Sequence, residues 1–223
     1  MTRFAVFDCD GTLVDGQADV CDTMEEAFKS RGFTRPDRNE VRRLVGLSLP
    51  IAIAQLLPNA DDDECAGLVE RYKELFRARR TSGQLHEPLY SGMAELLAQL
   101  HSDGWLLAVA TGKSQRGLEA CLETHGITEL FCSLQTADGH PSKPHPAMLE
   151  AALFESGAAA KDAVMIGDTS FDMEMGRAAG VHAIGVEWGY HTKDDLRNTG
   201  AANVARNIVH LGEILAKFGE ARA

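Results

Sequence analysis

Short apolar runs alternate with helical segments in the second half of the chain, and this alternation limits the possible folds more than any other feature. Three such runs are residues 105–112 (WLLAVATG), 163–168 (AVMIGD) and 181–189 (VHAIGVEWG). A fourth run, at 3–7 (RFAVF), ends where Asp10 and Gly11 indicate a turn. Strands that alternate with helices form right-handed β-α-β units, which place the strands side by side and parallel. The sequence therefore predicts an α/β fold with a mostly parallel sheet.

The segment between the first strand and residue 85 has a different pattern. Val20, Met24 and Phe28 recur at helical spacing, and similar patterns follow without a convincing strand between them. Gly32 ends the first of these helices, because glycine is common just after a helix. The helical patterns cover residues 19–32, 37–45, about 50–57 and 62–79.

An all-helical block inserted after the first strand predicts two domains. We expect residues 1–15 and 85–223 to form an α/β catalytic core, and residues 16–84 to form a helical cap. A chain of 223 residues, of which 44% are hydrophobic, is long enough for this arrangement. The predicted fold class is a Rossmann-like core with an inserted α-helical cap domain.

Charge and composition exclude several functions. The formal net charge is −11 and no basic run stands out, which argues against general binding to nucleic acid or to an anionic membrane. No stretch approaches the ~20 apolar residues of a membrane span, and the simplest expectation is a soluble cytoplasmic protein. The five cysteines have no C-x-x-C spacing, so we interpret them as reduced packing residues rather than disulfides or zinc ligands.

Polar residues follow the predicted strands, at the points where the strands end. Ligands bind outside the carboxyl ends of strands in an open parallel sheet, so positions that are far apart in the chain converge on one face. Lys143 belongs to the same set because it lies just before a predicted helix whose first turn contains Pro146. The residues expected to converge are Asp8, Asp10, Thr111, Gly112, Lys113, Asp168 and Asp172.

A cluster of carboxylates costs stability unless a cation compensates for the repulsion. Mg²⁺ suits such a cluster because it prefers carboxylate oxygens, a carbonyl and water, often together with a substrate phosphate. Lys143 and the backbone N–H groups near Gly11 and Gly112 are candidates for neutralising that phosphate. One aspartate can then attack phosphorus, and a second acid two residues later can protonate the leaving oxygen and activate water.

Four motifs occur in an order typical of one family. They are FDCDGTLVDG at 7–16, TGK at 111–113, KPHP at 143–146 and GDTSFDM at 167–173. In these motifs the chain resembles the haloacid dehalogenase superfamily of phosphohydrolases, over nearly its whole length. It is most similar to the phosphoglycolate-phosphatase-like branch, in which a helical cap is inserted after the first strand.

The resemblance implies specific catalytic roles. By this resemblance, Asp8 is the nucleophile and a magnesium ligand. Asp10 is the acid and base, and its backbone carbonyl also binds magnesium. Lys143 corresponds to the lysine that neutralises the nucleophile and the phosphate.

The resemblance also implies how phosphate and metal are held. Thr111 matches the position that hydrogen-bonds the phosphoryl oxygens, and the Gly112 amide assists it. Asp168 matches the direct acidic metal ligand, whereas Asp172 orients metal-bound water. Gly16 stands where this branch commonly has serine, which leaves the substrate open but removes no catalytic group.

Other residues allow more than one interpretation. Asp15 fits a solvated acid at the junction with the cap better than a metal ligand. Residues 45–50 (VGLSLP) are either a specificity loop or a plain helix junction, and Trp188 either lines the cleft or packs in the core. We assign no catalytic role to any of the eight histidines.

The leading hypothesis is a Mg²⁺-dependent phosphatase that acts on a small phosphorylated metabolite, with phosphoglycolate as the first candidate. The enzymatic alternative is a phosphosugar mutase similar to β-phosphoglucomutase, in which a sugar hydroxyl replaces water. Dehalogenation is less favoured because it leaves Asp10 unexplained. A non-enzymatic phospho-acceptor module is also less favoured, because receiver-like modules are shorter and lack the cap. The expected partner is a small-molecule phosphate ester, and both a monomer and a homodimer remain possible.

Overall fold

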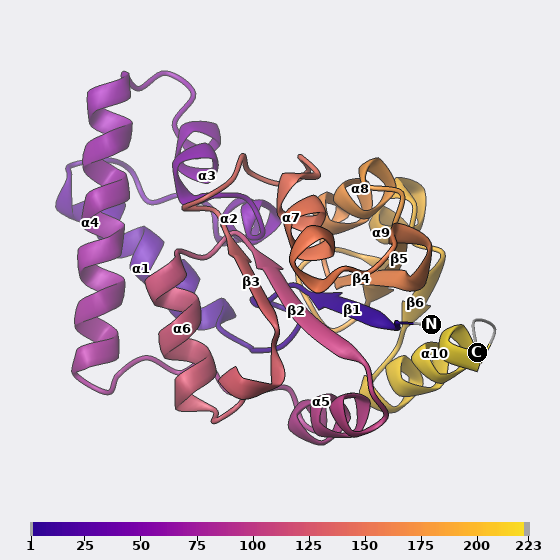
Figure 1. Ribbon diagram of the computed structural model, residues 1–223. Coiled ribbons are helices and arrows are strands. Elements are labelled where there is room, and N and C mark those ends of the chain that lie inside the picture. The colour runs from indigo at the N-terminus through magenta and orange to yellow at the C-terminus, as the bar shows by residue number, and fades with distance from the viewer. Residues whose placement is uncertain (1, 221–223) are drawn as a thin grey trace.

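Six parallel strands form one sheet in the computed structural model, which describes residues 2–220 (Figure 1). The strand order is β3-β2-β1-β4-β5-β6, and every neighbouring pair is parallel. This arrangement confirms the predicted α/β class with a Rossmann-like sheet. The strands are β1 (Phe4–Phe7), β2 (Leu106–Thr111), β3 (Ser133–Thr136), β4 (Ala163–Gly167), β5 (His182–Val186) and β6 (Asn203–Ala205).

The four apolar runs correspond to β1, β2, β4 and β5, but the sequence did not predict the two edge strands. β3 has the sequence SLQT, which lacks an apolar run, and β6 has only three residues. Both gain strand structure by pairing with a longer neighbour that is already buried. Pairing across the sheet, rather than local composition, therefore decides these two elements.

Helices cover both faces of the sheet. Side chains of α5, α6 and α10 pack with Ala5 and Phe7 of β1, whereas those of α7 and α8 pack with Phe4 and Val6. The alternation along β1 explains why the whole strand is buried, since successive side chains point to opposite faces. The core helices are α5 (Met93–Ser102), α6 (Gln115–Thr124), α7 (Ala147–Ser156), α8 (Ser170–Ala178), α9 (Lys193–Thr199) and α10 (Ile208–Glu220), with short 3₁₀ turns at Thr128–Leu130 and Ala160–Asp162.

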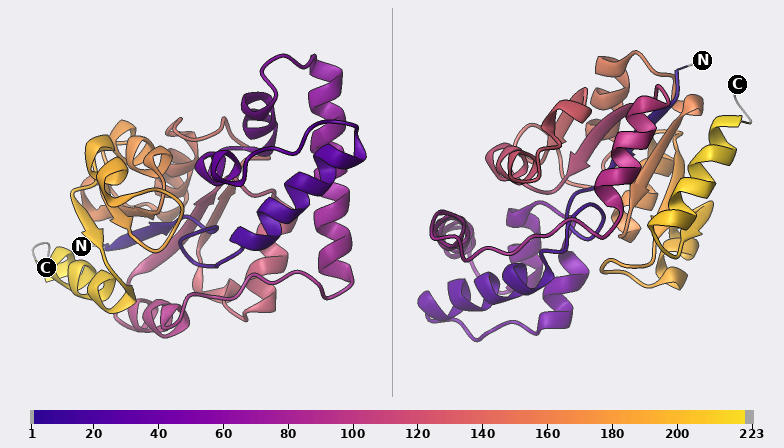
Figure 2. Two further views of the ribbon diagram at one scale, coloured as in Figure 1. Left: turned by 180° about the vertical axis from the view of Figure 1, so that it is seen from behind. Right: turned by 90° about the horizontal axis from the view of Figure 1, so that it is seen from below.

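The remaining four helices form what we call the cap segment, residues 17–81. They share an apolar cluster of their own, in which Phe28, Ile53 and Leu68 are almost fully buried. Figure 2 shows these helices to one side of the sheet. The four helical predictions are confirmed, while the division into domains at residues 16 and 84 stays a prediction. The helices are α1 (Gln17–Ser30), α2 (Arg38–Leu44), α3 (Leu49–Leu56) and α4 (Asp62–Thr81).

Both ends of the cap segment leave the core side by side. The Asp15 amide donates to the Pro88 carbonyl at 2.9 Å, and the Tyr90 amide donates to the Leu13 carbonyl at 3.0 Å. Asp15 is exposed at this junction, as predicted. The two chain segments that lead into and out of the cap segment therefore run next to each other and are joined by hydrogen bonds.

The carboxyl ends of the central strands point toward the cap segment (Figure 1). A cavity of about 590 Å³ lies there, lined by residues of both the core and the cap segment. The strand ends and the cap helices therefore line the same cavity, and the candidate site lies at this cavity. Within residues 2–220, no helix is both long enough and apolar enough to cross a membrane.

Candidate active site

Asp8 and Lys143 form a buried ion pair at the end of β1. The Lys143 Nζ lies 2.9 Å from Asp8 Oδ1 and 2.6 Å from Asp172 Oδ1. Both Asp8 and Lys143 are 1% exposed. Burial alone lowers the pKa of Lys143, but the carboxylates of Asp172 and Asp8 outweigh this effect and raise it above its usual value. Lys143 is therefore held as a cation against the predicted nucleophile.

Asp168 directly follows β4, and Asp172 lies in the first turn of α8. The Asp168 Oδ1 accepts a hydrogen bond from the Thr12 hydroxyl at 2.9 Å, and its Oδ2 accepts one from the Tyr190 amide at 2.8 Å. Asp172 occupies the third position of α8 and accepts from the amide and hydroxyl of Thr169, in a capping box. These bonds fix both carboxylates in orientation.

Three of these carboxylates lie close enough to hold one cation. Asp8, Asp168 and Asp172 each offer an oxygen, and the three oxygens lie within 4.8 Å of one another. Burial raises the pKa of Asp8 to about 7 despite the opposing effect of Lys143. Burial, followed by repulsion from Asp8 and Asp172, raises the pKa of Asp168 well above its usual range. A divalent cation would remove this repulsion.

The second oxygen of Asp8 provides a further test of metal fit. Asp8 Oδ2 is buried and has no hydrogen-bond partner among the described residues. An orphaned carboxylate oxygen beside two other buried carboxylates suits a hard cation, because oxygen is the ligand that Mg²⁺ prefers. The residues present therefore fit a magnesium ion.

Gly11 allows the loop after β1 to pass close to Asp168. Its φ is +79°, and a Cβ at this position would lie 2.3 Å from Asp168 Oδ2. Glycine is needed here for both reasons. Its amide donates to the Val14 carbonyl at 2.9 Å and is already paired, while phosphate binding by backbone N–H groups near Gly11 stays a prediction.

Asp10 lies in a second ionic cluster, which the motifs alone did not reveal. The Lys113 Nζ is 3.0 Å from Asp10 Oδ1 and 2.6 Å from Glu87 Oε1. The Arg80 Nη2 of α4 donates to the other oxygen of Glu87 at 2.8 Å. Lys113 also lies 5.5 Å from the centre of the Phe76 ring. The predicted acid and base is thus linked through Lys113 to the cap segment.

Thr111 is the last residue of β2 and Gly112 follows it, and both line the cavity. Thr111 is 1% exposed, and its hydroxyl accepts a hydrogen bond from the Lys113 amide at 3.3 Å. A Cβ on Gly112 would lie 2.6 Å from the Leu47 carbonyl oxygen, so only glycine allows the cap segment to approach here. Residues 45–50 therefore lie against the core and line the cavity, which favours the specificity-loop interpretation.

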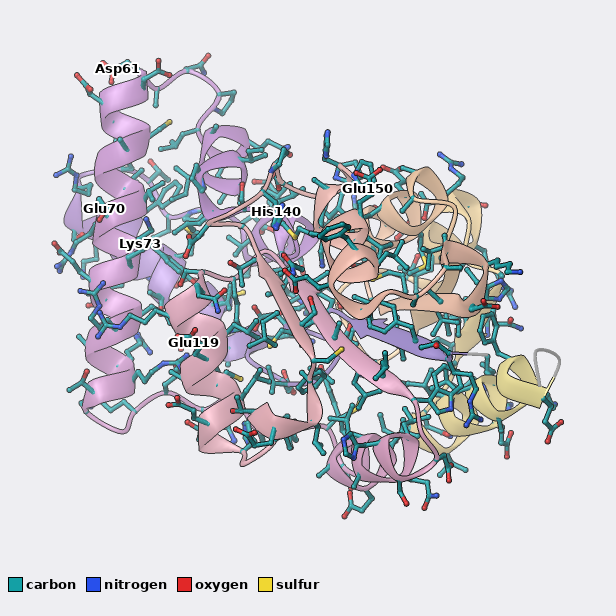
Figure 3. All side chains as sticks on the ribbon, viewed as in Figure 1. Asp61, Glu70, Lys73, Glu119, His140 and Glu150 are labelled. Carbon is teal, nitrogen blue, oxygen red and sulfur yellow. The ribbon has the colours of Figure 1, made fainter. Side chains whose placement is uncertain are left out.

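Other candidates have structural partners. Trp188 packs on Tyr90, with ring centres 6.1 Å apart, and its Nε1 donates to the Thr12 carbonyl at 3.2 Å. This favours the packing interpretation of Trp188. The Nε2 of His140, labelled in Figure 3, lies 2.7 Å from Gln135 Oε1. Among the described residues, neither side chain lines the cavity.

Comparison with known proteins identifies the family. The profile described as haloacid dehalogenase-like hydrolase matches residues 5–186. The chain belongs to this family. The match includes all four motifs, so the family prediction is confirmed, as is the prediction of a hydrolase.

Two curated proteins and a solved structure extend this result. The probable phosphatase IndB of Dickeya dadantii is 36% identical over 200 residues, which cover 88% of this haloacid dehalogenase-like hydrolase and 86% of IndB. The phosphoglycolate phosphatase of Vibrio parahaemolyticus is 27% identical over 219 residues, or 96% of each chain. A haloacid dehalogenase-like family protein of Streptococcus pneumoniae superposes with a TM-score of 0.82 at 27% identity, covering 97% of this chain and 98% of its own.

Proposed function

We propose that this hydrolase is a Mg²⁺-dependent phosphatase that acts on a small phosphorylated metabolite through an aspartyl-phosphate intermediate. The observation that carries the proposal is Asp8, a buried carboxylate at the cavity with one oxygen paired to Lys143 and the other without a hydrogen-bond partner. Burial and this ion pair hold the carboxylate of Asp8 in place at the cavity, and the adjacent Lys143 cation allows a phosphate dianion to approach.

In the first step, an Asp8 carboxylate oxygen attacks phosphorus and the bond from phosphorus to the ester oxygen breaks. Asp10 gives its proton to that oxygen, which leaves as an alcohol. Thr111 and the Gly112 amide hold the phosphoryl oxygens, and Lys143 balances their negative charge. The step yields a phosphorylated Asp8 and an ionised Asp10.

In the second step, Asp10 accepts a proton from water while the water oxygen attacks phosphorus. The bond from phosphorus to Asp8 then breaks, which releases inorganic phosphate and restores both carboxyl groups to their starting states.

Magnesium completes this site in the proposal. Asp8, Asp168 and the backbone carbonyl of Asp10 would hold the ion, and Asp172 would orient a water molecule beside it. When bound, the ion supplies positive charge that offsets the carboxylates and the developing charge on the phosphoryl group. The three clustered carboxylates support this assignment.

Phosphoglycolate is the first substrate to test, because several curated relatives are named phosphoglycolate phosphatase. Purified protein should be incubated with phosphoglycolate and p-nitrophenyl phosphate, with Mg²⁺ or with a chelator. We expect phosphate release that depends on Mg²⁺ and returns when Mg²⁺ is added back. Folded protein that releases no phosphate from any ester in the presence of Mg²⁺ would contradict the proposal.

A phosphosugar mutase would share the first step and differ in the acceptor. Product analysis with β-glucose 1-phosphate separates the two reactions, since a mutase yields an isomerised sugar phosphate and a phosphatase yields free phosphate. We expect free phosphate alone from any turnover of this sugar. An isomerised product would instead show that the protein is a phosphosugar mutase.

A further inference from the structure

The cavity above Asp8 is much larger than a two-carbon substrate requires. Its volume of about 590 Å³ lies within the range of pockets that enclose drug-sized ligands, roughly 300–1,000 Å³. Asp8 and Asp10 are among its lining residues, and the phosphoryl group would bind beside them. The rest of the space is therefore available to the leaving group.

The cap segment gives this space an apolar wall. Every lining residue contributed by α1, α2 and α3 is apolar, including Met24, Leu44 and Ala52. On α4, the rings of Tyr72 and Phe76 stack with centres 5.6 Å apart and planes at 20°. The helices α1, α2 and α3 thus line the cavity with hydrocarbon, and α4 contributes these two rings together with the polar side chains of Lys73, Arg77, Arg80 and Thr81.

The charged side chains around the cavity are mostly committed to other charged groups. Lys113 and Arg80 both bind Glu87, and the Lys73 Nζ lies 3.0 Å from Glu70 Oε1 on the same helix, where both are labelled in Figure 3. Arg77 and Arg116 also line the cavity, both exposed and without a side-chain partner in residues 2–220, and the other charged groups offer few free hydrogen bonds to a leaving group rich in hydroxyls. Such a group would lose bonds to water without replacing them.

We propose that the preferred substrate is a phosphate monoester whose leaving group is a bulky apolar alcohol carrying one or two carbon rings. This inference rests on the proposed phosphatase function and narrows its substrate class. Such a group removes apolar surface from water at the cap wall, whereas glycolate or a short alcohol leaves most of that wall wet. The preference for such esters then follows from the binding of the leaving group, since the phosphoryl-transfer reaction is the same for every ester.

The direct test compares ethyl, benzyl and naphthylmethyl phosphate with phosphoglycolate. All four are esters of primary alcohols, so bond cleavage is similar and the pocket sets most of the difference. With Mg²⁺ present, we expect kcat/KM to rise at least about tenfold from ethyl to naphthylmethyl phosphate, and phosphoglycolate to rank with the ethyl ester. Calorimetry on the Asp8→Asn variant should give a similar order of Kd without turnover.

Two cavity-filling variants test the location of the effect. Ala52→Phe places a ring inside the cavity, and Leu44→Trp does so from another helix. Either change should lower the ratio of kcat/KM for naphthylmethyl over ethyl phosphate by about tenfold. Ala54→Phe is the matched control, because Ala54 is exposed on the same helix as Ala52 and does not line the cavity. In Ala54→Phe, the ratio of kcat/KM for naphthylmethyl over ethyl phosphate should equal that of the unmodified protein.

The outcomes separate the two proposals. If ethyl phosphate or phosphoglycolate is hydrolysed and bound as well as the naphthylmethyl ester, the substrate inference is wrong while the phosphatase function stands. If the folded protein hydrolyses none of the esters with Mg²⁺, the phosphatase function is wrong and the substrate inference falls with it. If neither filled variant folds, the binding order on Asp8→Asn alone decides.

Discussion

The floor and the wall of the cavity differ in chemistry. Asp8 lines the floor, at the strand ends, and forms a buried network of ion pairs with Lys143 and Asp172, which do not themselves line the cavity. The wall, contributed by the cap helices, is largely hydrocarbon and aromatic. A charged floor suits phosphoryl transfer, which is the same for every phosphate ester, whereas an apolar wall distinguishes one leaving group from another. We therefore expect changes to the floor to lower kcat, and changes to the wall to alter selectivity.

The largest expected effect is at Asp8. Asp8→Asn removes the nucleophile but keeps the shape of the side chain, so kcat should fall by at least ~10⁴-fold with every ester. Circular dichroism and thermal melting should show a folded protein. Asp15→Asn is the matched control, since Asp15 is an exposed acid seven residues away in the same motif, and its kcat should be unchanged. Substantial turnover by Asp8→Asn would refute the nucleophile assignment.

The next effect is at Lys143, which joins Asp8 to Asp172. Lys143→Met should lower kcat by ~10²–10³-fold, because the phosphoryl charge loses its balancing cation. It should also lower the melting temperature, since breaking a buried ion pair costs about 3–5 kcal/mol. Lys193→Met provides the comparison, because Lys193 pairs with Glu187 in a partly exposed position. An unchanged kcat in folded Lys143→Met would show that the floor works without this cation.

A smaller effect is expected where floor and wall meet, at Lys113. Lys113→Met frees Asp10 from its contact with Lys113 and breaks the link to Glu87. We expect kcat for alkyl esters to fall about tenfold, because a misplaced Asp10 protonates the leaving oxygen poorly. The loss should be smaller for p-nitrophenyl phosphate, whose leaving group needs little protonation. Equal losses for both ester types would mean that Lys113 does not position Asp10.

The smallest effect concerns two arginines at the cavity. Arg77 and Arg116 are exposed, and no partner of either side chain is found in the described part of the chain. Changing both to Gln should lower kcat/KM about threefold at low salt and leave kcat unchanged, because exposed cations steer anionic substrates. The difference should shrink at high salt. A loss that persists at high salt would indicate direct contact with the substrate instead.

The sequence predicted the floor better than the wall for a physical reason. Asp8, Asp168 and Asp172 follow strands, and parallel strands bring their carboxyl ends together, so local motifs were enough to predict that they meet. Glu87 gives no such signal, because its pairing with Lys113 depends on how the chain returns from the cap segment.

The sequence did not predict the apolar wall of the cavity, for a different reason. Met24 and Phe76 read as ordinary core positions, because the apolar stripe of a helix looks the same whether it packs on a neighbour or lines a cavity. The edge strands β3 and β6 were missed because pairing rather than composition forms them. Local motifs and the topology of parallel strands were therefore enough to predict the residues at the strand ends, whereas the cavity wall and the edge strands depend on tertiary packing that no local pattern shows.

The most direct test of the account is to identify the phosphorylated residue during turnover. Protein mixed with a phosphate ester and Mg²⁺ is quenched in acid within milliseconds, digested and analysed by mass spectrometry. We predict one phosphoryl group on the peptide that contains Asp8, absent in Asp8→Asn and after full turnover. A phosphoryl group on a different residue, or turnover in which no phosphorylated peptide forms at any time point, would contradict the central claim that Asp8 is the nucleophile.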